Sequence, residues 1–329
     1  MPRHVAPMLA VPSDRLPRDA ANWGFEYKWD GVRAIAYCDR ASIHLESRNL
    51  LDITVRYPEL QPLANDLGRR VVLDGEIVAL DDTGRPSFAM LQRRMHANDR
   101  DAIARLRDAV PVYYFVFDVL WLEGQSLMSH PYAHRREILD DIFVPGDSYK
   151  LSPVHADGDG VYETAQAHRL EGIIAKRLDS PYQPGRRTPA WRKIKLIKNQ
   201  EFVIGGWTPE KDGSRRGYGL GALLVGYYEP AGGPGERKLR LAGKVGSGFT
   251  AVSAETMLDL LQSRRRATNP FADRPPQRDA MFIEPVLVAE IEYRRWPEGG
   301  QVQQAVFKGL RTDKRPTEVL KESDALTRE

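Results

Sequence analysis

One stretch of the sequence decides how the rest of the chain is interpreted: Glu26-Tyr27-Lys28-Trp29-Asp30-Gly31-Val32-Arg33. It lies within residues 24–48, which read as strands that turn at residues 30–31 and again at residues 39–41. A lysine at the end of a strand, beside a turn that contains glycine, can present its amine to a ligand phosphate. Lysine is a covalent nucleophile only when neutral, so the pKa of Lys28 has to fall from about 10.4. Arg33, the cations at 193–195 or a bound metal can supply the field that lowers it, whereas the alternative is an ordinary charged surface turn.

Length and composition limit the class of protein. The chain has 329 residues, enough for about two domains, and its 42% hydrophobic and 28% charged residues are typical of a globular protein. No run approaches the ~18 apolar residues of a membrane span, and the first residues do not read as a signal peptide. The single cysteine, Cys38, excludes a disulfide within the chain and a multi-cysteine metal site. We therefore expect a cytoplasmic protein without a membrane partner.

The pattern of elements predicts an α+β fold with antiparallel sheets in the first part of the chain. Strands are expected at 71–80, 112–120, 172–177 and 191–196, and helices at 58–65, 88–95, 102–109, 130–142 and 160–168. The strands and helices do not alternate strictly, which argues against a doubly wound parallel sheet.

The pattern changes after residue 199. Five strands are expected at 202–207, 222–228, 238–244, 286–293 and 302–307, with a helix at 252–264 between the third and the fourth. This is the element order of an OB-fold barrel, which binds nucleic acid through one face and its loops. The sequence therefore predicts two domains, residues 1–199 and residues 200–329.

Further motifs follow the first one in a fixed order. They are 47–49 (SRN), 73–78 (LDGEIV), 116–120 (VFDVL), 171–176 (EGIIAK), 191–195 (WRKIK) and 307–314 (FKGLRTDK). Together with residues 26–33 they resemble the covalent nucleotidyltransferases, which comprise DNA ligases, RNA ligases and mRNA capping enzymes. Residues 202–209 and 242–249 resemble more closely the ATP-dependent ligase module of bacterial non-homologous end-joining ligases.

The resemblance implies an adenylation domain followed by an OB-fold domain, and an ATP-dependent DNA ligase that acts in DNA repair and recombination. Such an enzyme seals 5′-phosphate and 3′-hydroxyl ends through a lysyl-AMP and a DNA-adenylate. The alternatives are an RNA ligase, an mRNA guanylyltransferase or a non-catalytic DNA-binding relative. The implied partners are nicked or broken duplex DNA and a Ku-type end-binding protein, and the enzyme is expected to act as a monomer at the bacterial nucleoid.

The resemblance also assigns roles to individual residues. Catalysis is assigned to Lys28, which carries the AMP, and to Arg33, Lys193, Lys195, Arg311 and Lys314. Nucleotide binding is assigned to Glu26, Tyr27, Arg33, Arg48, Glu76, Phe117, Lys193 and Lys195. In many relatives a glycine follows the SRN motif, whereas this chain has Leu50, so the loop after Arg48 departs from the family pattern.

Glu76 and Glu171 are the expected ligands of Mg²⁺ or Mn²⁺, because each carboxylate lies beside a glycine at the end of a strand and hard oxygen donors suit these ions. The alternative for both is a structural salt bridge with a nearby lysine. Phe117 can stack on adenine or simply pack in the core. Lys193 and Lys195 alternate along one strand, so both can face the phosphates.

The C-terminal motif lies far from Lys28 in the sequence. The resemblance assigns Arg311, Asp313 and Lys314 to the triphosphate, so the second domain has to close for the first step and then withdraw. Residues 198–201 are the expected hinge. The cations between residues 183 and 200, among which no acid occurs, can neutralise DNA phosphates or form an ordinary solvated face.

Overall fold

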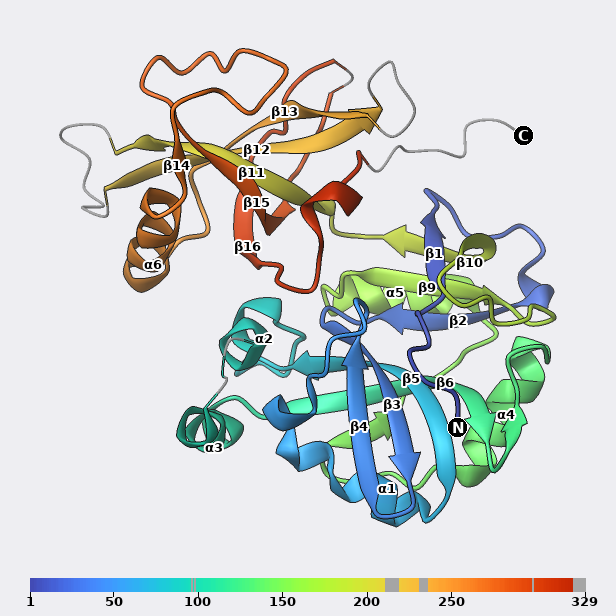
Figure 1. The fold of residues 1–329 in the computed structure, drawn as a ribbon. Helices are drawn as coiled ribbons and strands as arrows, with labels where there is room; N and C mark the ends of the chain where they lie inside the picture. The colour runs from blue at the N-terminus through green and yellow to red at the C-terminus, as the bar shows by residue number, and fades with distance from the viewer. Residues whose placement is uncertain (96, 98, 211–218, 231–235, 298, 322–329) are drawn as a thin grey trace. The chain divides into compact units, whose positions relative to one another are not determined.

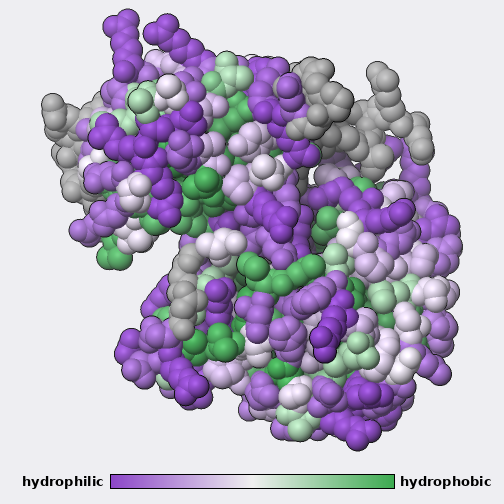
Figure 2. Space-filling model, in the orientation of Figure 1, coloured by the Kyte–Doolittle hydropathy of each residue, from purple (hydrophilic) through white to green (hydrophobic). Residues whose placement is uncertain are grey.

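The computed structural model describes residues 1–95, 97, 99–210, 219–230, 236–297 and 299–321 (Figure 1). Packing divides the chain into a first compact unit, Met1–Leu196, and a second unit that begins at Ile197. The sequence placed this division after residue 199. No helix in the described ranges has the length and apolarity needed to cross a membrane. Hydrophilic side chains predominate on the visible face of each unit, and small apolar patches are scattered among them (Figure 2).

The first unit contains two sheets. The four-stranded sheet has the order β1 (Leu9–Pro12), β10 (Arg187–Lys195), β9 (Gly172–Arg177), β2 (Trp23–Lys28). The six-stranded sheet has the order β4 (Ser42–Ser47), β3 (Val32–Asp39), β5 (Arg70–Ala79), β6 (Val112–Leu122), β7 (Gln125–Ser126), with β8 (Tyr149–Leu151) beside β6. Only β1 with β10 and β6 with β8 pair in parallel; the other described pairs are antiparallel, which confirms the predicted α+β class.

Helices cover the outer faces of these sheets. They are α1 (Pro62–Leu67), α2 (Phe88–Met95), α3 (Arg100–Ala109), α4 (Tyr132–Ile142) and α5 (Gly158–Ala167), with short 3₁₀ turns at Ala20–Asn22, Thr54–Arg56 and Pro58–Leu60. The helix expected over residues 58–65 is therefore split in two. The carboxylate of Asp157 caps α5 by accepting a hydrogen bond from the Gly160 N–H at 3.1 Å.

The four-stranded sheet buries one face against α5 (Figure 1). Trp23, Phe25, Ile173 and Ile194 alternate along β2, β9 and β10 and form a core with Val161 of the helix. Because side chains alternate across a strand, the intervening residues of the same strands point to the other face, toward the six-stranded sheet. That other face contains most of the predicted site residues.

The second unit is a barrel-like sheet with one helix. Its strand order is β13 (Arg237–Val245), β12 (Leu220–Pro230), β11 (Asn199–Pro209), β15 (Met281–Glu292), β14 (Arg265–Arg266), and β16 (Val306–Leu310) pairs with the other edge of β15. The helix α6 (Ala251–Gln262) follows β13, and a 3₁₀ turn at Pro316–Glu318 follows β16. Five of these strands and the helix have the order that the sequence predicted for an OB fold.

Two strands differ from their predicted bounds for identifiable reasons. β15 begins at Met281 instead of residue 286, because the register with β11 shifts after Ile204 and accommodates Pro285, which has no N–H to donate. β16 begins at Val306 instead of residue 302, because Gln304 has a left-handed backbone with φ of 51° that interrupts a strand.

The predicted hinge is also narrower than expected. Residues 199–201 lie inside β11 and pair with Glu292, Ile291 and Glu290 of β15. Only residues 196–198 lie between β10 and β11. The link between the two units is therefore these three residues.

Candidate active site

The pairing of β2, β9 and β10 arranges the predicted lysines in rows. Lys28 pairs with Gly172, and Gly172 pairs with Lys195. Directly paired residues place their side chains on the same face of a sheet, so Lys28 and Lys195 flank a position that has no side chain. A Cβ atom at Gly172 would collide with the carbonyl oxygen of Ile194, so only glycine allows this close approach of β9 and β10.

Two further rows continue along the same face. The second row contains Glu26, Ile174 and Lys193, and the third contains Lys176 and Trp191. The sheet therefore brings Glu26, Lys28, Lys193 and Lys195 together, as the sequence predicted. Tyr27 is not brought together with them, because its side chain packs on the α5 face with Trp29 and His155 as edge-on neighbours.

Glu171, the residue before β9, forms an ion pair with Lys28 Nζ. Burial opposes the charge on Lys28, but the nearby carboxylate of Glu171 outweighs burial and the repulsion from Lys195, so the pKa of Lys28 is raised above its ordinary value. The sequence predicted that the pKa of a nucleophilic Lys28 has to fall, whereas here it is raised. The reason is that the strongest charge acting on Lys28 is that of the Glu171 carboxylate and not that of the neighbouring cations. The salt bridge considered for Glu171 is therefore present.

Arg33 on β3 is held by a buried carboxylate. Its Nε and Nη2 donate to the two oxygens of Asp74 at 2.5 and 2.6 Å, and the Tyr182 hydroxyl donates to the same carboxylate at 2.6 Å. Burial opposes the guanidinium charge, but Asp74 outweighs it and raises the pKa of Arg33. Any phosphate contact of Arg33 has to be made by a side chain that is already fixed in a bidentate pair.

Phe117 on β6 lies at the centre of an aromatic cluster. Its ring meets that of Trp191 edge-on at 6.3 Å, and the Arg33 guanidinium lies 4.5 Å from its centre. The side chain is buried in a small core with Ile35 and Leu120. Phe117 therefore packs in the core, which was one of the two alternatives that the sequence offered. Its contact with adenine stays a prediction.

Glu26 is 2% exposed and has two partners. The Tyr132 hydroxyl of α4 donates to its Oε1 at 2.6 Å, and Lys176 Nζ lies 2.5 Å from the same oxygen. Neither of these partners of Glu26 was predicted from the sequence. Lys176 could have been found, because it ends the 171–176 motif at the spacing that places it on the face of Ile174. Tyr132 has no local signal, since it comes from another element.

The remaining predicted residues of the first unit lie around this face. Glu76 on β5 is the direct cross-strand partner of Arg33, and Arg48 follows the last residue of β4. Leu50 has a left-handed backbone with φ of 60°, and its N–H donates to the Ser47 carbonyl at 2.8 Å. This conformation favours glycine, which is the residue that many relatives have at that position.

The donor atoms of Glu171 and Glu76 suit a hard divalent ion. No group of three or more histidine, cysteine or acidic side chains is arranged to hold a metal ion within the described ranges. Mg²⁺ is commonly held by one or two carboxylates together with substrate phosphates, so two glutamates beside the lysine rows fit this type of binding.

The C-terminal cations lie in the second unit and are paired there. Arg311 donates to Asp313 at 2.8 Å and to Glu290 at 2.6 Å, and Lys314 lies 2.7 Å from Glu201. Burial opposes the charge on Asp313, but Arg311 outweighs it and lowers the pKa of this carboxyl group. The three motif residues therefore lie in one network with carboxylates of β15 and β11.

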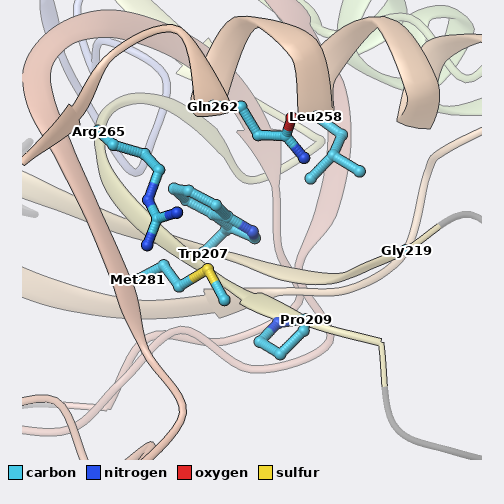
Figure 3. Close-up of a pocket in the computed structure, with 7 residues that line it drawn as sticks. All are labelled: Trp207, Pro209, Gly219, Leu258, Gln262, Arg265 and Met281. Carbon is cyan, nitrogen blue, oxygen red and sulfur yellow. The ribbon is translucent and has the colours of Figure 1, made fainter.

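A pocket in the second unit is lined mainly by apolar residues, unlike the charged face of the four-stranded sheet. It lies between α6 and the strands and is lined by Trp207, Pro209, Gly219, Leu258, Gln262, Arg265 and Met281 (Figure 3). Leu258 and Gln262 project from α6 toward Trp207 (Figure 3). Arg265 is the one charged residue among those that line this pocket, and none of the predicted site residues lines it. The candidate active site is therefore the face of the four-stranded sheet that carries the lysine rows.

Comparison with known families gives two matches that together span most of the sequence. Residues 7–195 match the family described as ATP dependent DNA ligase domain, and residues 216–314 match the ATP dependent DNA ligase C terminal region. Both matches agree with the order of the motifs in the sequence.

Individual relatives are similar over nearly the whole chain. The chain is 38% identical over 323 residues to the multifunctional non-homologous end joining protein LigD of Mycolicibacterium smegmatis, covering 97% of the chain and 40% of that relative. It is 31% identical to DNA ligase C1 of the same organism, covering 95% of the chain and 91% of the relative. The chain thus spans less than half the length of the multifunctional relatives.

A solved structure, mycobacterial DNA ligase D complexed with ATP and MES, superimposes with a TM-score of 0.69 at 36% identity. The similarity covers 96% of this chain and 98% of the solved one. The ligase domain of Mycobacterium tuberculosis LigD matches with a TM-score of 0.52 at 37% identity, covering 96% and 98%.

Proposed function

Because the chain belongs to the ATP-dependent DNA ligase family, with an adenylation domain followed by an OB-fold domain, we propose that it joins 5′-phosphate and 3′-hydroxyl ends of duplex DNA. The observation that carries the proposal is the row formed by Lys28 and Lys195 across Gly172, with Glu171 beside it. The family membership confirms the resemblance inferred from the motifs and favours a DNA ligase over the RNA ligase and capping enzyme.

In the first step the amine of Lys28 loses a proton and attacks the α-phosphorus of ATP. The N–P bond forms, the bond from the α-phosphorus to the bridging oxygen breaks, and pyrophosphate leaves. The 5′-phosphate of the DNA then takes the AMP from Lys28, and attack by the 3′-hydroxyl seals the strand and releases AMP. Lys193 and Lys195 hold phosphate oxygens as positive charges during these transfers.

Glu171 and Glu76 would hold the divalent cation, Mg²⁺ or Mn²⁺. When bound, the cation neutralises negative charge that develops on the pyrophosphate. Glu171 has a second role in this chain, because its carboxylate is the partner of Lys28. A ligand that engages Glu171 removes the interaction that raises the pKa of Lys28 and so favours the neutral amine.

Arg311, Asp313 and Lys314 act in the first step through the triphosphate. For this purpose their present pairs with Glu290 and Glu201 have to open, and the second unit has to move about residues 196–198. Arg311 and Lys314 then orient pyrophosphate for departure in line with the Lys28 attack. The withdrawal of the second unit exposes the adenylated lysine to the DNA.

The partner is nicked or broken duplex DNA. The relative from Mycolicibacterium smegmatis is named for non-homologous end joining, which supports repair of double-strand breaks together with a Ku-type protein at the nucleoid. We expect a monomer whose contacts are mainly to the phosphates through the cations between residues 183 and 200. Affinity for a nicked duplex should then be nearly independent of sequence and fall by about tenfold or more between 50 and 200 mM salt. A filter-binding or anisotropy titration that changes little with salt would contradict this expectation.

The central test is covalent labelling with α-labelled ATP. Lys28→Ala should abolish the label, whereas Lys150→Ala, which replaces an exposed lysine of β8, should label as the wild type does. GTP and NAD should label poorly, which separates the ligase from a guanylyltransferase. Persistent labelling of Lys28→Ala would refute the assignment of the nucleophile, and no sealing of nicked DNA by the wild type would refute the proposed function.

A further inference from the structure

The turn that follows β4 exposes several apolar side chains close together. Eight large apolar side chains are exposed among the described residues, and three of them lie within residues 50–55. Leu50, Leu51 and Val55 are 36%, 56% and 67% exposed. Apolar residues that are exposed singly need no explanation, whereas a local concentration of them indicates a surface that contacts a partner.

Hydrogen bonds hold this turn in one conformation. The Leu50 N–H donates to the Ser47 carbonyl at 2.8 Å, and the Ser47 N–H donates to the Leu51 carbonyl at 2.9 Å. The carboxylate of Asp52 accepts from the N–H and the hydroxyl of Thr54 at 2.8 and 2.6 Å. Side chains that a fixed backbone presents lose less conformational entropy on binding, so the turn is preorganised for a contact.

Leucine is an unfavourable residue for the backbone of this turn. The φ of 60° at Leu50 lies in the left-handed region, which favours glycine and strains a bulky side chain. The same side chain also leaves apolar surface in water. Glycine would remove both costs, so the presence of Leu50 indicates a contact that lies outside the chain.

The turn lies at the edge of the candidate active site. Ser47, the last residue of β4, pairs with Ala34 of β3. β4 therefore ends beside the beginning of β3, and β3 begins four residues after Lys28 (Figure 1). Arg33 directly precedes Ala34, as the turn directly follows Ser47. A DNA break that is brought to Lys28 and Arg33 thus passes close to the exposed leucines.

We propose that Leu50 and Leu51 form an apolar wedge that enters the minor groove of duplex DNA beside the break and distinguishes a broken strand from an intact one. This inference rests on the proposed function. Residues 48–56 contain two cations, Arg48 and Arg56, and one acid, Asp52, so their net charge suits a phosphate backbone. Apolar side chains in the minor groove partly unstack and kink the duplex. This deformation costs less where one strand is interrupted, because that strand no longer resists the bend.

The test measures the Kd for a labelled duplex with a single nick and for the same duplex without it, by fluorescence anisotropy. The nick lacks its 3′-hydroxyl, so it cannot be sealed during the titration. Leu50→Gly combined with Leu51→Ser should raise the Kd for the nicked duplex about 10- to 50-fold and that for the intact duplex less than about 2-fold. Leu51→Ser alone should raise the Kd for the nicked duplex about 5-fold.

Salt and a matched variant separate this contact from a general effect on DNA binding. The loss of affinity should be the same factor at about 50 and 200 mM salt, because an apolar contact releases no counterions. Val144→Ser replaces a 47% exposed valine that lies outside the turn, and it should bind both duplexes as the wild type does. A loss that depends steeply on salt would overturn the inference.

Thermal unfolding separates this role from a structural one. Leu50→Gly should leave the midpoint of unfolding unchanged or raise it, because glycine adopts the left-handed backbone without strain. A lower midpoint together with equal losses of affinity for the nicked and the intact duplex would overturn the inference. Unchanged affinity of the variants for both duplexes would also overturn it and would favour a protein as the partner of this turn. A wild type that seals no nicked DNA refutes the proposed function, whereas an active wild type whose leucine variants still distinguish the two duplexes refutes this inference alone.

Discussion

Cations of the first and second units are both paired with carboxylates, but the partners differ in kind. Lys28 is paired with Glu171, which is itself a predicted site residue and which ligands can engage. Arg311 and Lys314 are paired with Glu290 and Glu201, which lie on strands of their own barrel and have no predicted role in the reaction. Arg311 is also paired with Asp313 of its own motif. The first pair therefore joins two residues with predicted roles in the reaction, whereas the pairs with Glu290 and Glu201 tie two motif cations to strands of the second unit.

This difference has an energetic consequence. Lys28 is the last residue of β2 and Glu171 directly precedes β9, so this pair lies at the end of two neighbouring strands and not within a buried network of several pairs. Arg311 has two partners and is 10% exposed, so its release breaks a buried network. Breaking a buried pair by removing one partner is costly, and phosphate oxygens of a ligand have to replace the lost carboxylates.

The largest effect is expected at Glu171, where the first pair is broken. Glu171→Gln should lower self-adenylation and nick sealing by about 100-fold or more, because a proposed ligand of the cation that neutralises the pyrophosphate charge is lost. It should also lower the pKa of Lys28, since Glu171 is the nearest charge that raises it. The residual rate, measured against pH, should therefore reach its plateau at a lower pH than in the wild type. Rates and a pH profile equal to those of the wild type would show that Glu171 is only structural.

A smaller effect on activity is expected at Lys314, and it should be confined to one step. Lys314→Ala should slow self-adenylation about 10- to 100-fold, because one cation facing pyrophosphate is lost. Phosphodiester formation on nicked DNA that is already adenylated should stay close to normal. Lys308→Ala is the matched control, because Lys308 is a more exposed lysine of β16 paired with Glu292 at 3.1 Å. Equal losses in both steps would mean that Lys314 serves DNA binding or stability.

The smallest effect on catalysis is expected at Asp313, where the change appears in stability. Asp313→Asn should destabilise the chain at neutral pH by about 1 to 3 kcal/mol, measured by urea unfolding. The folded-state pKa of Asp313 is lowered, so its contribution is present above the ordinary value of 3.8 and is lost as the pH falls through the lower folded value. The difference between wild type and variant should therefore shrink below about pH 4. If the loss of stability in Asp313→Asn does not change with pH, the charge of the Asp313 carboxylate does not contribute through its pair with Arg311.

Strict periodicity made much of the fold predictable. Strands such as Gly172–Arg177 and the helix Phe88–Met95 agree with their predicted bounds, because alternation and helical spacing are local properties. Alternation also indicated correctly that Lys193 and Lys195 share a face. β1, β7, β8 and β14 were missed, since strands of two to four residues contain too few positions for a period to show.

The partners of the site residues were harder to predict. Asp74 holds Arg33 from a neighbouring strand, and Tyr132 reaches Glu26 from α4, across 106 positions of sequence. Such contacts depend on how elements pack, which no local pattern encodes. The raised pKa of Lys28 was not predicted for the same reason, because the sequence shows many cations nearby but not that the contact is made by Glu171.

The ion pair of Lys28 with Glu171 also bears on unwanted reactions of the amine. An amine that reacts readily with a phosphoanhydride is also open to carbamylation, acylation and addition to aldehydes. Only the neutral amine undergoes these reactions. By raising the pKa of Lys28, Glu171 lowers the fraction of neutral amine, and a ligand that engages this carboxylate raises that fraction again. We therefore expect the pair to slow chemical modification of Lys28 while no nucleotide is bound.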